Sequence, residues 1–289
     1  MSTQSFEGGQ YREYLEVAKQ AAFGAGEFIS RAFSSTDKGV KDKGKATDLV
    51  TETDQACENY IRETIKKVFP EHKFIGEEEV AASGGIQPTL TNEPTWMCDP
   101  LDGTTNFVHG FPFVCTCIAL VIDKQIVAGV VHNPVLRETF TAARGCGAFM
   151  NGNPISVTEE KELGRALCAT EVGVHRDFET MMAISERLMK VTNATRSIRC
   201  SGSCAMNMCG VALGRLDAFF EIGFGGCWDV AAAALIVQEA GGQVLDPSGG
   251  EFDVMARRVL ATNKYLDKPL SGIIASCFTG PNEPEAPEK

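Results

Sequence analysis

Two aspartates lie three residues apart, directly after an apolar run, in the segment Trp96-Met-Cys-Asp99-Pro-Leu-Asp102-Gly-Thr-Thr. The apolar run predicts a strand over residues 95–98, and the C-terminal end of a strand is where α/β proteins usually carry their sites. Pro100 and Gly103 alone would suit a simple turn, but a turn does not require two carboxylates. Oxygen ligands at this density suit Mg²⁺, which typically takes one or two carboxylates, water and phosphate oxygens.

Other carboxylates occur in comparable contexts. Glu77 directly follows a short predicted strand, whereas Glu78 and Glu79 are expected to face solvent. Asp229 opens an apolar helix, where it can act as the N-cap. The helix N-terminus would also lower the cost of placing its charge near other carboxylates, so a cap and a metal ligand are compatible roles.

A further carboxylate lies on the apolar side of a predicted helix. Residues 51–68 carry an apolar stripe of Cys57, Ile61, Ile65 and Val68, and Asp54 lies three residues before Cys57 on the same side. An acidic side chain in that position needs a specific reason.

The segment from Arg199 to Cys204, Arg-Cys-Ser-Gly-Ser-Cys, ends a predicted strand and begins a predicted helix. Its backbone N–H groups could receive an anion or substrate hydroxyls. A plain serine cap explains the same pattern.

These candidate residues are distributed over a mixed set of predicted elements. Helices are expected at 11–33, 51–68, 178–190, 204–213 and 230–240, and strands at 73–75, 95–98, 114–122, 126–132, 138–142, 148–150, 166–171, 197–199, 217–221 and 243–245. The mixture predicts layered α/β halves, roughly 11–150 and 151–276, within one unit spanning 1–280. The Pro/Glu-rich segment 281–289 is expected to be a disordered tail.

Composition excludes several classes of protein. The 289 residues are 44% hydrophobic and 22% charged, with a formal net charge of −11, so nucleic acid is a poor partner. The apolar stretches are shorter than the ~20 residues that span a bilayer, and the N-terminus lacks signal-peptide features, so we expect no membrane association and a cytoplasmic protein. The eleven cysteines are expected to be thiols, mostly buried as small apolar side chains.

Taken together, these motifs resemble the inositol monophosphatase family, within the lithium-sensitive, magnesium-dependent phosphatase superfamily. The resemblance covers about residues 11–276 and rests on Gly76-Glu-Glu, Asp99-Pro-Leu-Asp-Gly-Thr-Thr and Trp228-Asp-Val-Ala, in the family's order and spacing. The segments 111–115, 201–204 and 223–229 further resemble the plant-type branch, whose members can also hydrolyse L-galactose 1-phosphate. The resemblance implies an α+β fold, a five-layer αβαβα sandwich, usually assembled as a homodimer.

The resemblance also implies roles for individual residues. The metal ligands would be Glu77, Asp99, the carbonyl of Leu101, Asp102 and Asp229, holding two or three Mg²⁺ ions with Asp99 bridging two of them. The catalytic group that orients the attacking water would be Asp54 and Thr104, with Glu77 contributing. Residues that contact the sugar or cyclitol phosphate would be Glu77, Leu101, Asp102, Gly103, Thr104, Gly202, Ser203, Cys204, Glu221 and Asp229.

The implied reaction is hydrolysis of a phosphate monoester, most simply myo-inositol 1-phosphate, by direct attack of a metal-activated water. No covalent intermediate is then required, and Li⁺ should inhibit. Lys43 matches a family lysine near the site, or is one more charge in a solvated loop. The loop around Val174 and His175 departs from the animal enzymes, which leaves the preferred substrate open.

The same motifs are partly consistent with other functions. An Asp followed by Asp-Gly-Thr also suggests a phosphoaspartate phosphatase, but there the two carboxylates are two residues apart, not three. A non-catalytic metal-binding scaffold on the same fold would not need Asp54, Glu77 and Thr104 together. L-galactose 1-phosphate remains an alternative substrate, and fructose 1,6-bisphosphate, phosphoadenosine phosphate and histidinol phosphate are further members of the superfamily's substrate range.

Overall fold

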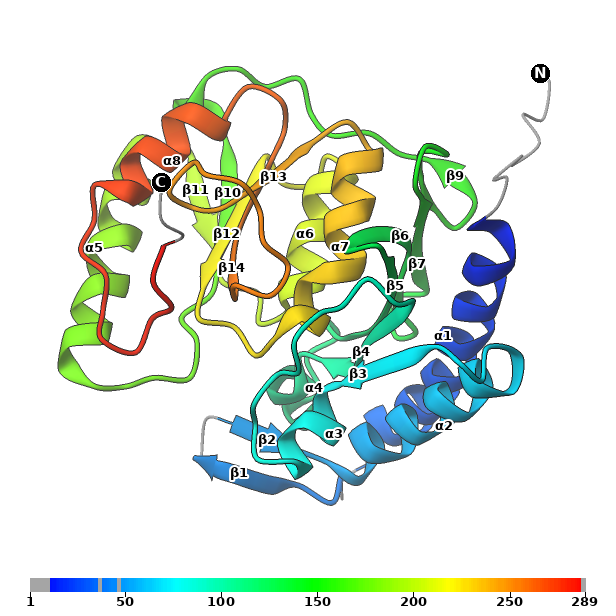
Figure 1. The fold of residues 1–289 in the computed structure, drawn as a ribbon. Helices are drawn as coiled ribbons and strands as arrows, with labels where there is room; N and C mark the ends of the chain where they lie inside the picture. Colours follow the sequence, from blue (N-terminus) through cyan, green and yellow to red (C-terminus); the bar gives the residue numbers. More distant parts are fainter. Residues whose placement is uncertain (1–10, 36–37, 46–47, 287–289) are drawn as a thin grey trace.

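Helices and sheets alternate in five layers in the computed structural model, which describes residues 11–35, 38–45 and 48–286 (Figure 1). Helices α1 (Arg12–Phe33) and α2 (Glu52–Val68) cover one face of a seven-stranded sheet, and α6 (Cys204–Ala212) and α7 (Cys227–Glu239) cover the other. A five-stranded sheet follows, with α5 (Phe178–Ala194) and α8 (Asp267–Ala275) on its outer face. The expected α+β fold, a five-layer αβαβα sandwich, is confirmed.

The outer helices of the first layer form where the apolar periodicity predicts them. Helix α1 (Arg12–Phe33) buries a run of alanines with Leu15 and Ile29, and α2 (Glu52–Val68) buries Cys57, Ile61 and Ile65. Such an apolar stripe at a spacing of three and four residues drives a helix onto a sheet. A capping box at Thr51 begins α2.

The seven-stranded sheet has the order β3-β4-β5-β6-β7-β8-β9, with β3 parallel to β4 and all other pairs antiparallel. Its strands are β3 (Lys73–Gly76), β4 (Thr95–Asp102), β5 (Cys115–Ile122), β6 (Gln125–Asn133), β7 (Glu138–Ala143), β8 (Ala148–Met150) and β9 (Asn153–Pro154). Strands β4, β5 and β6 are buried almost along their whole length because helices cover both of their faces.

The central layer consists of α6 (Cys204–Ala212) and α7 (Cys227–Glu239). Residues 227–237 of α7 are all buried, because the helix is enclosed between the two sheets. Gly129 of β6 permits the contact: a Cβ at this glycine would lie 2.7 Å from the carbonyl oxygen of Ala232. Although α7 belongs to the predicted second half of the chain, it contacts β4, β5, β6 and β7 of the first.

The second sheet has the order β11-β10-β12-β14-β13 and is mixed: β10 is parallel to β11 and β12, while β14 is antiparallel to β12 and β13. Its strands are β10 (Leu167–Thr170), β11 (Ser197–Arg199), β12 (Ala218–Ile222), β13 (Gln243–Leu245) and β14 (Arg258–Thr262). Helices α5 (Phe178–Ala194) and α8 (Asp267–Ala275) pack on its outer face.

Several elements lie outside the predicted set. They are the hairpin β1 (Lys41–Lys45) and β2 (Asp48–Val50), the short helices α3 (Glu77–Ala82) and α4 (Thr104–His109), a 3₁₀ turn at Leu163–Arg165, and β9, β14 and α8. The expected disordered tail also needs correction for its first residues. Glu283 is buried and pairs with Arg187 of α5, because an acidic side chain there meets a buried guanidinium.

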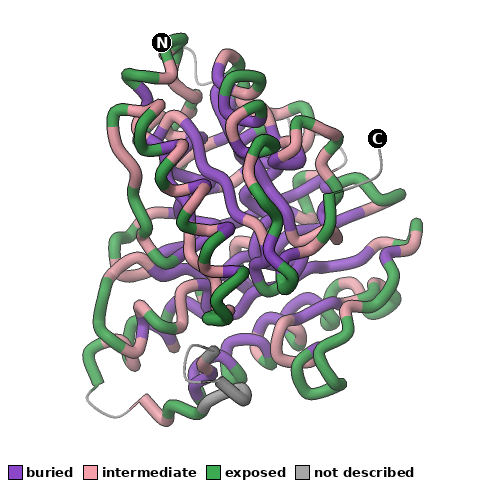
Figure 2. Tube along the Cα trace, turned by 90° about the vertical axis from the view of Figure 1, so that its left-hand side faces the viewer, coloured by how far each residue is buried: buried purple, intermediate pink, exposed green. Residues whose placement is uncertain are grey.

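Buried residues fill the layers between the sheets and helices, and exposed residues form the periphery (Figure 2). All eleven cysteines lie in the described part of the chain and are free thiols, most of them buried. Among the described helices, none is both long enough and apolar enough to cross a membrane.

Candidate active site

Strand β4 delivers two buried carboxylates to one side of the sheet. In a regular strand, residues three apart point to opposite faces. The pairing of β4 with β5 shifts register between Asp99 and Asp102, and this irregularity turns both side chains the same way. The carboxylate oxygens of Asp99, Asp102 and Asp229 lie within 4.8 Å of one another.

Asp229 reaches this cluster from the first turn of α7. It is not the N-cap that the sequence allowed as one of its roles: the cap residue is Gly226, and Asp229 is the third residue of the helix. The Gly226 N–H donates to Asp229 Oδ2 at 2.6 Å, so one carboxylate oxygen closes the helix end. Burial, followed by the charges of Asp102 and Glu77, raises the pKa of Asp229 to about 8.

Asp102 is held by the start of α6. Its Oδ2 accepts from Ser203 Oγ at 2.7 Å and from the Ala205 N–H at 2.8 Å. Burial raises the pKa of Asp102 to about 6, and these two donors oppose the rise. Three buried carboxylates without a counter-cation repel one another, and an all-oxygen donor set of this kind fits a hard divalent cation.

Glu77 is the first residue of α3 and lines the same cavity. Its charge is, after burial, the largest cause of the raised pKa of Asp99, which places the two carboxylates close together. Sequence reasoning missed the residue that orients this turn: buried Glu58 accepts from the N–H groups of Glu78 and Glu79 at 2.8 and 2.9 Å. Glu79 does not simply face solvent, because it also pairs with Arg62 at 2.9 Å.

Asp54 and Thr104 lie in contact, as the family resemblance implied. Thr104 Oγ1 lies 3.2 Å from Asp54 Oδ1 and 3.1 Å from the carbonyl oxygen of Leu101. The other oxygen of Asp54 accepts from the Thr51 N–H at 2.8 Å and from the Thr51 hydroxyl, which completes the capping box of α2. The buried carboxylate therefore has a structural role in the cap of α2, and its Oδ1 also reaches the site through Thr104.

The start of α6 contributes in a way that the sequence did not indicate. The Ser201 and Gly202 N–H groups donate to Glu171 Oε1 at 2.8 and 2.7 Å, and Asn207 Nδ2 donates to the same atom at 2.7 Å. Glu171 directly follows β10, so the rule that sites gather at strand ends could have found it. Its charge adds to burial in raising the pKa of nearby Glu221.

One cavity of about 620 Å³ gathers most of the predicted site. Its lining includes Glu77, Asp102, Gly103, Thr104, Gly202, Ser203, Cys204, Glu221 and Asp229. Asp54, Asp99 and Leu101 are buried next to this lining. Val174 also lines the cavity, and the side chain of Lys43 lies outside the described residues.

Two buried cysteines lie behind Asp102. Cys115 Sγ lies 3.7 Å from Asp102 Oδ2 and 3.7 Å from Cys117 Sγ. Burial raises the pKa of both thiols, which keeps them neutral and supports their interpretation as small apolar residues.

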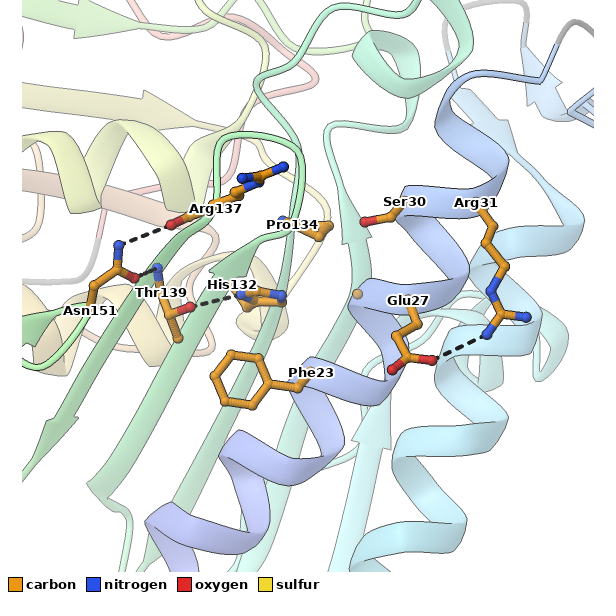
Figure 3. A pocket seen from close by; sticks show the side chains of 10 residues that line it. Phe23, Glu27, Ser30, Arg31, His132, Pro134, Arg137, Thr139 and Asn151 are labelled. Carbon is orange, nitrogen blue, oxygen red and sulfur yellow. Dashed lines mark hydrogen bonds and ion pairs between the residues drawn. The ribbon is translucent and has the colours of Figure 1, made fainter.

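A different cavity lies between α1 and strands β6 and β7 (Figure 3). Its polar groups bond one another: Glu27 pairs with Arg31 at 3.2 Å, and His132 Nδ1 lies 2.9 Å from Thr139 Oγ1. Burial lowers the pKa of His132 to about 4, so the ring is neutral. This cavity lacks the convergent carboxylates of the first one, and we assign it no chemistry.

Comparison with known proteins gives a consistent result. A model of the inositol monophosphatase family matches residues 10–277. "Inositol monophosphatase 2" of Solanum lycopersicum is 59% identical over 254 residues, which are 88% of this chain and 95% of the relative. "Inositol monophosphatase 1" of Homo sapiens is 43% identical, covering 89% of this chain and 91% of the relative. The solved inositol monophosphatase from Anabaena (Nostoc) sp. PCC 7120 superimposes with a TM-score of 0.80 at 30% identity, covering 93% and 98% of the two chains.

Proposed function

The chain belongs to the inositol monophosphatase family, a family of metal-dependent phosphatases, and from this membership we propose that it hydrolyses myo-inositol 1-phosphate to myo-inositol and phosphate. The observation that carries the proposal is the convergence of Asp99, Asp102 and Asp229 within 4.8 Å, in one cavity with Glu77 and Thr104. A non-catalytic scaffold would not require the Thr104–Asp54 contact beside those carboxylates.

We assign the metal role to Glu77, Asp99, Asp102, Asp229 and the carbonyl of Leu101, with two or three Mg²⁺ ions as the cofactor. Their oxygen-only chemistry fits this ion. Bound Mg²⁺ would supply neutralisation of the phosphate charge, a lowered pKa for water and stabilisation of the leaving alkoxide.

The residues of the chain itself orient the attacking water. The Thr104 hydroxyl can donate to Asp54 Oδ1 while its lone pair accepts from a water. Asp54 is fixed for this task because Thr51 occupies its other oxygen. A proton leaving the water can thus pass through Thr104 Oγ1 toward Asp54, and we assign a contributing role to Glu77, which lines the same cavity. This is general-base assistance by a positioned pair.

The opposite part of the cavity would bind the alcohol. We assign the phosphate contact to the backbone of Gly103 and Thr104, and hydroxyl contacts to Gly202, Ser203, Cys204 and Glu221. Oε2 of Glu221 is buried and has no hydrogen-bond partner among the described residues, which makes it an acceptor for a substrate hydroxyl.

The experiment that tests the function is phosphate release with Mg²⁺ from a panel of esters, compared by kcat/KM. The panel contains myo-inositol 1-phosphate, L-galactose 1-phosphate, fructose 1,6-bisphosphate, phosphoadenosine phosphate and histidinol phosphate. We expect the highest value for myo-inositol 1-phosphate. A higher value for L-galactose 1-phosphate would change the assigned substrate, and no release from any ester would refute the function.

We also propose that the protein is a cytoplasmic homodimer. Light scattering would test the mass of the assembly, and a fluorescent fusion would test its location in the cell.

A further inference from the structure

The last described segment, residues 278–286, follows α8 and lies beyond the family match, which ends at residue 277. Figure 1 shows this segment in red beside α5. We call it the C-terminal strap. Within the described residues, its hydrogen bonds reach α5 and Arg258 of β14 as well as the strap itself.

A buried ion pair anchors the strap to the middle of α5. Both terminal nitrogens of the Arg187 guanidinium donate to Glu283, Nη1 to Oε2 at 3.1 Å and Nη2 to Oε1, and the two side chains are 6% and 3% exposed. The Gly280 N–H donates to Glu283 Oε2 at 2.7 Å, and Arg187 also donates to the Phe278 carbonyl at 3.2 Å. Both carboxylate oxygens of Glu283 and both terminal nitrogens of Arg187 thus hold the strap in place, and a buried ion pair is stable only with such additional hydrogen bonds.

A second anchor lies at the start of α5. Asn282 Nδ2 donates to Asp177 Oδ2 at 2.7 Å, while Asp177 Oδ1 caps the helix by accepting from the Thr180 N–H at 2.9 Å. Gly280 packs on the same turn, because a Cβ there would lie 2.7 Å from Thr180 Cα. Asp177 directly follows residues 172–176, and four of these five residues line the active-site cavity.

A third anchor lies beside the turn after β12. Arg258 is fixed by a buried pair with Asp246 at 2.7 Å and donates to the Pro284 carbonyl at 2.9 Å. Pro284 lies against Gly223: a Cβ at this glycine would be 3.6 Å from Pro284 Cδ. Gly223 also lines the active-site cavity.

From these three anchors we infer that the C-terminal strap positions the wall formed by residues 172–176 and the turn at Gly223, in the cavity that also holds the residues assigned to the substrate hydroxyls. The strap bonds Asp177, which directly follows residues 172–176, and it packs against Gly223. The carboxylate end of the cavity comes from β4, α3 and α7, and the strap makes no hydrogen bond to these elements within the described residues. The strap is therefore a positioning segment for affinity, and not for the phosphate chemistry; this inference rests on the proposed function.

The test uses the full chain and three strap variants. Asn282→Ala removes the bond to Asp177, Glu283→Gln removes the charge that pairs with Arg187, and a truncated chain ends at Cys277. Glu138→Gln is the control, because it weakens another bidentate Arg–Glu pair, with Arg215 at 2.6 Å, that is more exposed and lies away from the strap. For each protein we would measure kcat and KM for myo-inositol 1-phosphate, Ki for inorganic phosphate, and amide hydrogen exchange at residues 172–177.

We expect the strap variants to raise KM about three- to tenfold, the usual range for coupling through a packed network. Their kcat and their Ki for phosphate should stay unchanged, and exchange at 172–177 should accelerate. The control should change none of these values. Unchanged KM and unchanged exchange would overturn the inference, as would a parallel rise in KM and in Ki for phosphate.

Two outcomes remain interpretable on their own. If the truncated chain fails to fold, Asn282→Ala decides, because it removes one hydrogen bond of a residue that is not buried. If the full chain does not hydrolyse myo-inositol 1-phosphate, the proposed function fails, whereas exchange at 172–177 still tests whether the strap holds the loop.

Discussion

Replacing Asp54 with asparagine separates the two roles that this side chain can have. The substitution keeps the size of the group but removes its charge and turns one acceptor oxygen into a donor. In the structure, one oxygen receives the Thr51 N–H at 2.8 Å and the other lies 3.2 Å from Thr104 Oγ1. The first contact caps α2, and the second belongs to the proposed water-orienting pair.

The two roles differ in magnitude. Loss of a helix cap costs about 1 kcal/mol of stability, which lowers Tm by roughly 2–4 °C in a chain of this size class. This is a small part of the ~5–15 kcal/mol of a folded protein, so almost all molecules stay folded. Loss of a positioned acid–base group lowers kcat by about 10²-fold or more, equivalent to ~2.7 kcal/mol in the barrier. We therefore expect a large loss of kcat with a small loss of Tm.

The assay is steady-state phosphate release at saturating Mg²⁺, with Tm measured on the same preparations. Thr51→Ala is the control, because it removes the hydroxyl that bonds Asp54 but leaves the Thr104 contact. It should lower Tm similarly and keep kcat within a few-fold of wild type. Thr104→Ala should lower kcat, and the Asp54→Asn/Thr104→Ala double variant should cost much less than the product of the two single effects. An unchanged kcat in Asp54→Asn with a lowered Tm would show that Asp54 only caps the helix.

Chelation with EDTA should abolish turnover reversibly, and the Mg²⁺-induced rise in Tm should grow between about pH 4 and pH 8. The reason is that burial raises the pKa of Asp102 to about 6 and that of Asp229 to about 8 in the metal-free protein. The folded state therefore binds these protons more tightly than the unfolded state, and stability without Mg²⁺ falls as the pH rises through this range. Over the same range, the negative charge available to the cation increases. A Tm rise that is largest at acidic pH would contradict this reasoning. A chiral phosphate ester should yield inorganic phosphate with inverted configuration, because water attacks phosphorus directly; retention would indicate a phosphorylated enzyme. Gly103→Ala should cost about 1–3 kcal/mol and reduce activity, since φ is 88° and the new Cβ would lie 2.9 Å from a backbone oxygen. Gly110→Ala, at φ 69° with open space around the Cβ, should cost less by thermal melting, and equal costs would refute a role for the close contact.

The long helices and most strands could be predicted because their signals are local. The apolar spacing of α1 and α2, and the apolar runs of β4, β5 and β6, repeat at periods that single elements impose. The acidic segment after β4 could be recognised for the same reason, since its carboxylates are close along the chain. The structure also places Glu77 and Asp229 beside it, from elements that the sequence could only suggest were neighbours.

The elements and site residues that the sequence did not predict depend on short segments or on contacts between residues far apart in the chain. Helices α3 and α4 have six residues each, too few for a periodic signal. Glu171 acquires its role from N–H groups about thirty positions later, and Glu283 is buried only because Arg187 lies opposite it. The tail composition predicts disorder, but one buried partner is enough to hold its first residues in place.

The enclosed position of α7 also has a consequence during synthesis on the ribosome. The helix ends at Glu239, whereas the strands that it covers are complete at Ala143. At ~5–20 residues per second, roughly 5–20 s of elongation pass before α7 can emerge and pack. Throughout that interval one apolar face of the larger sheet lacks the helix that covers most of it, and an uncovered apolar sheet promotes association between chains. We therefore expect the nascent chain to be prone to association until α7 arrives, and a stop codon within α7 should give insoluble product instead of a folded N-terminal fragment.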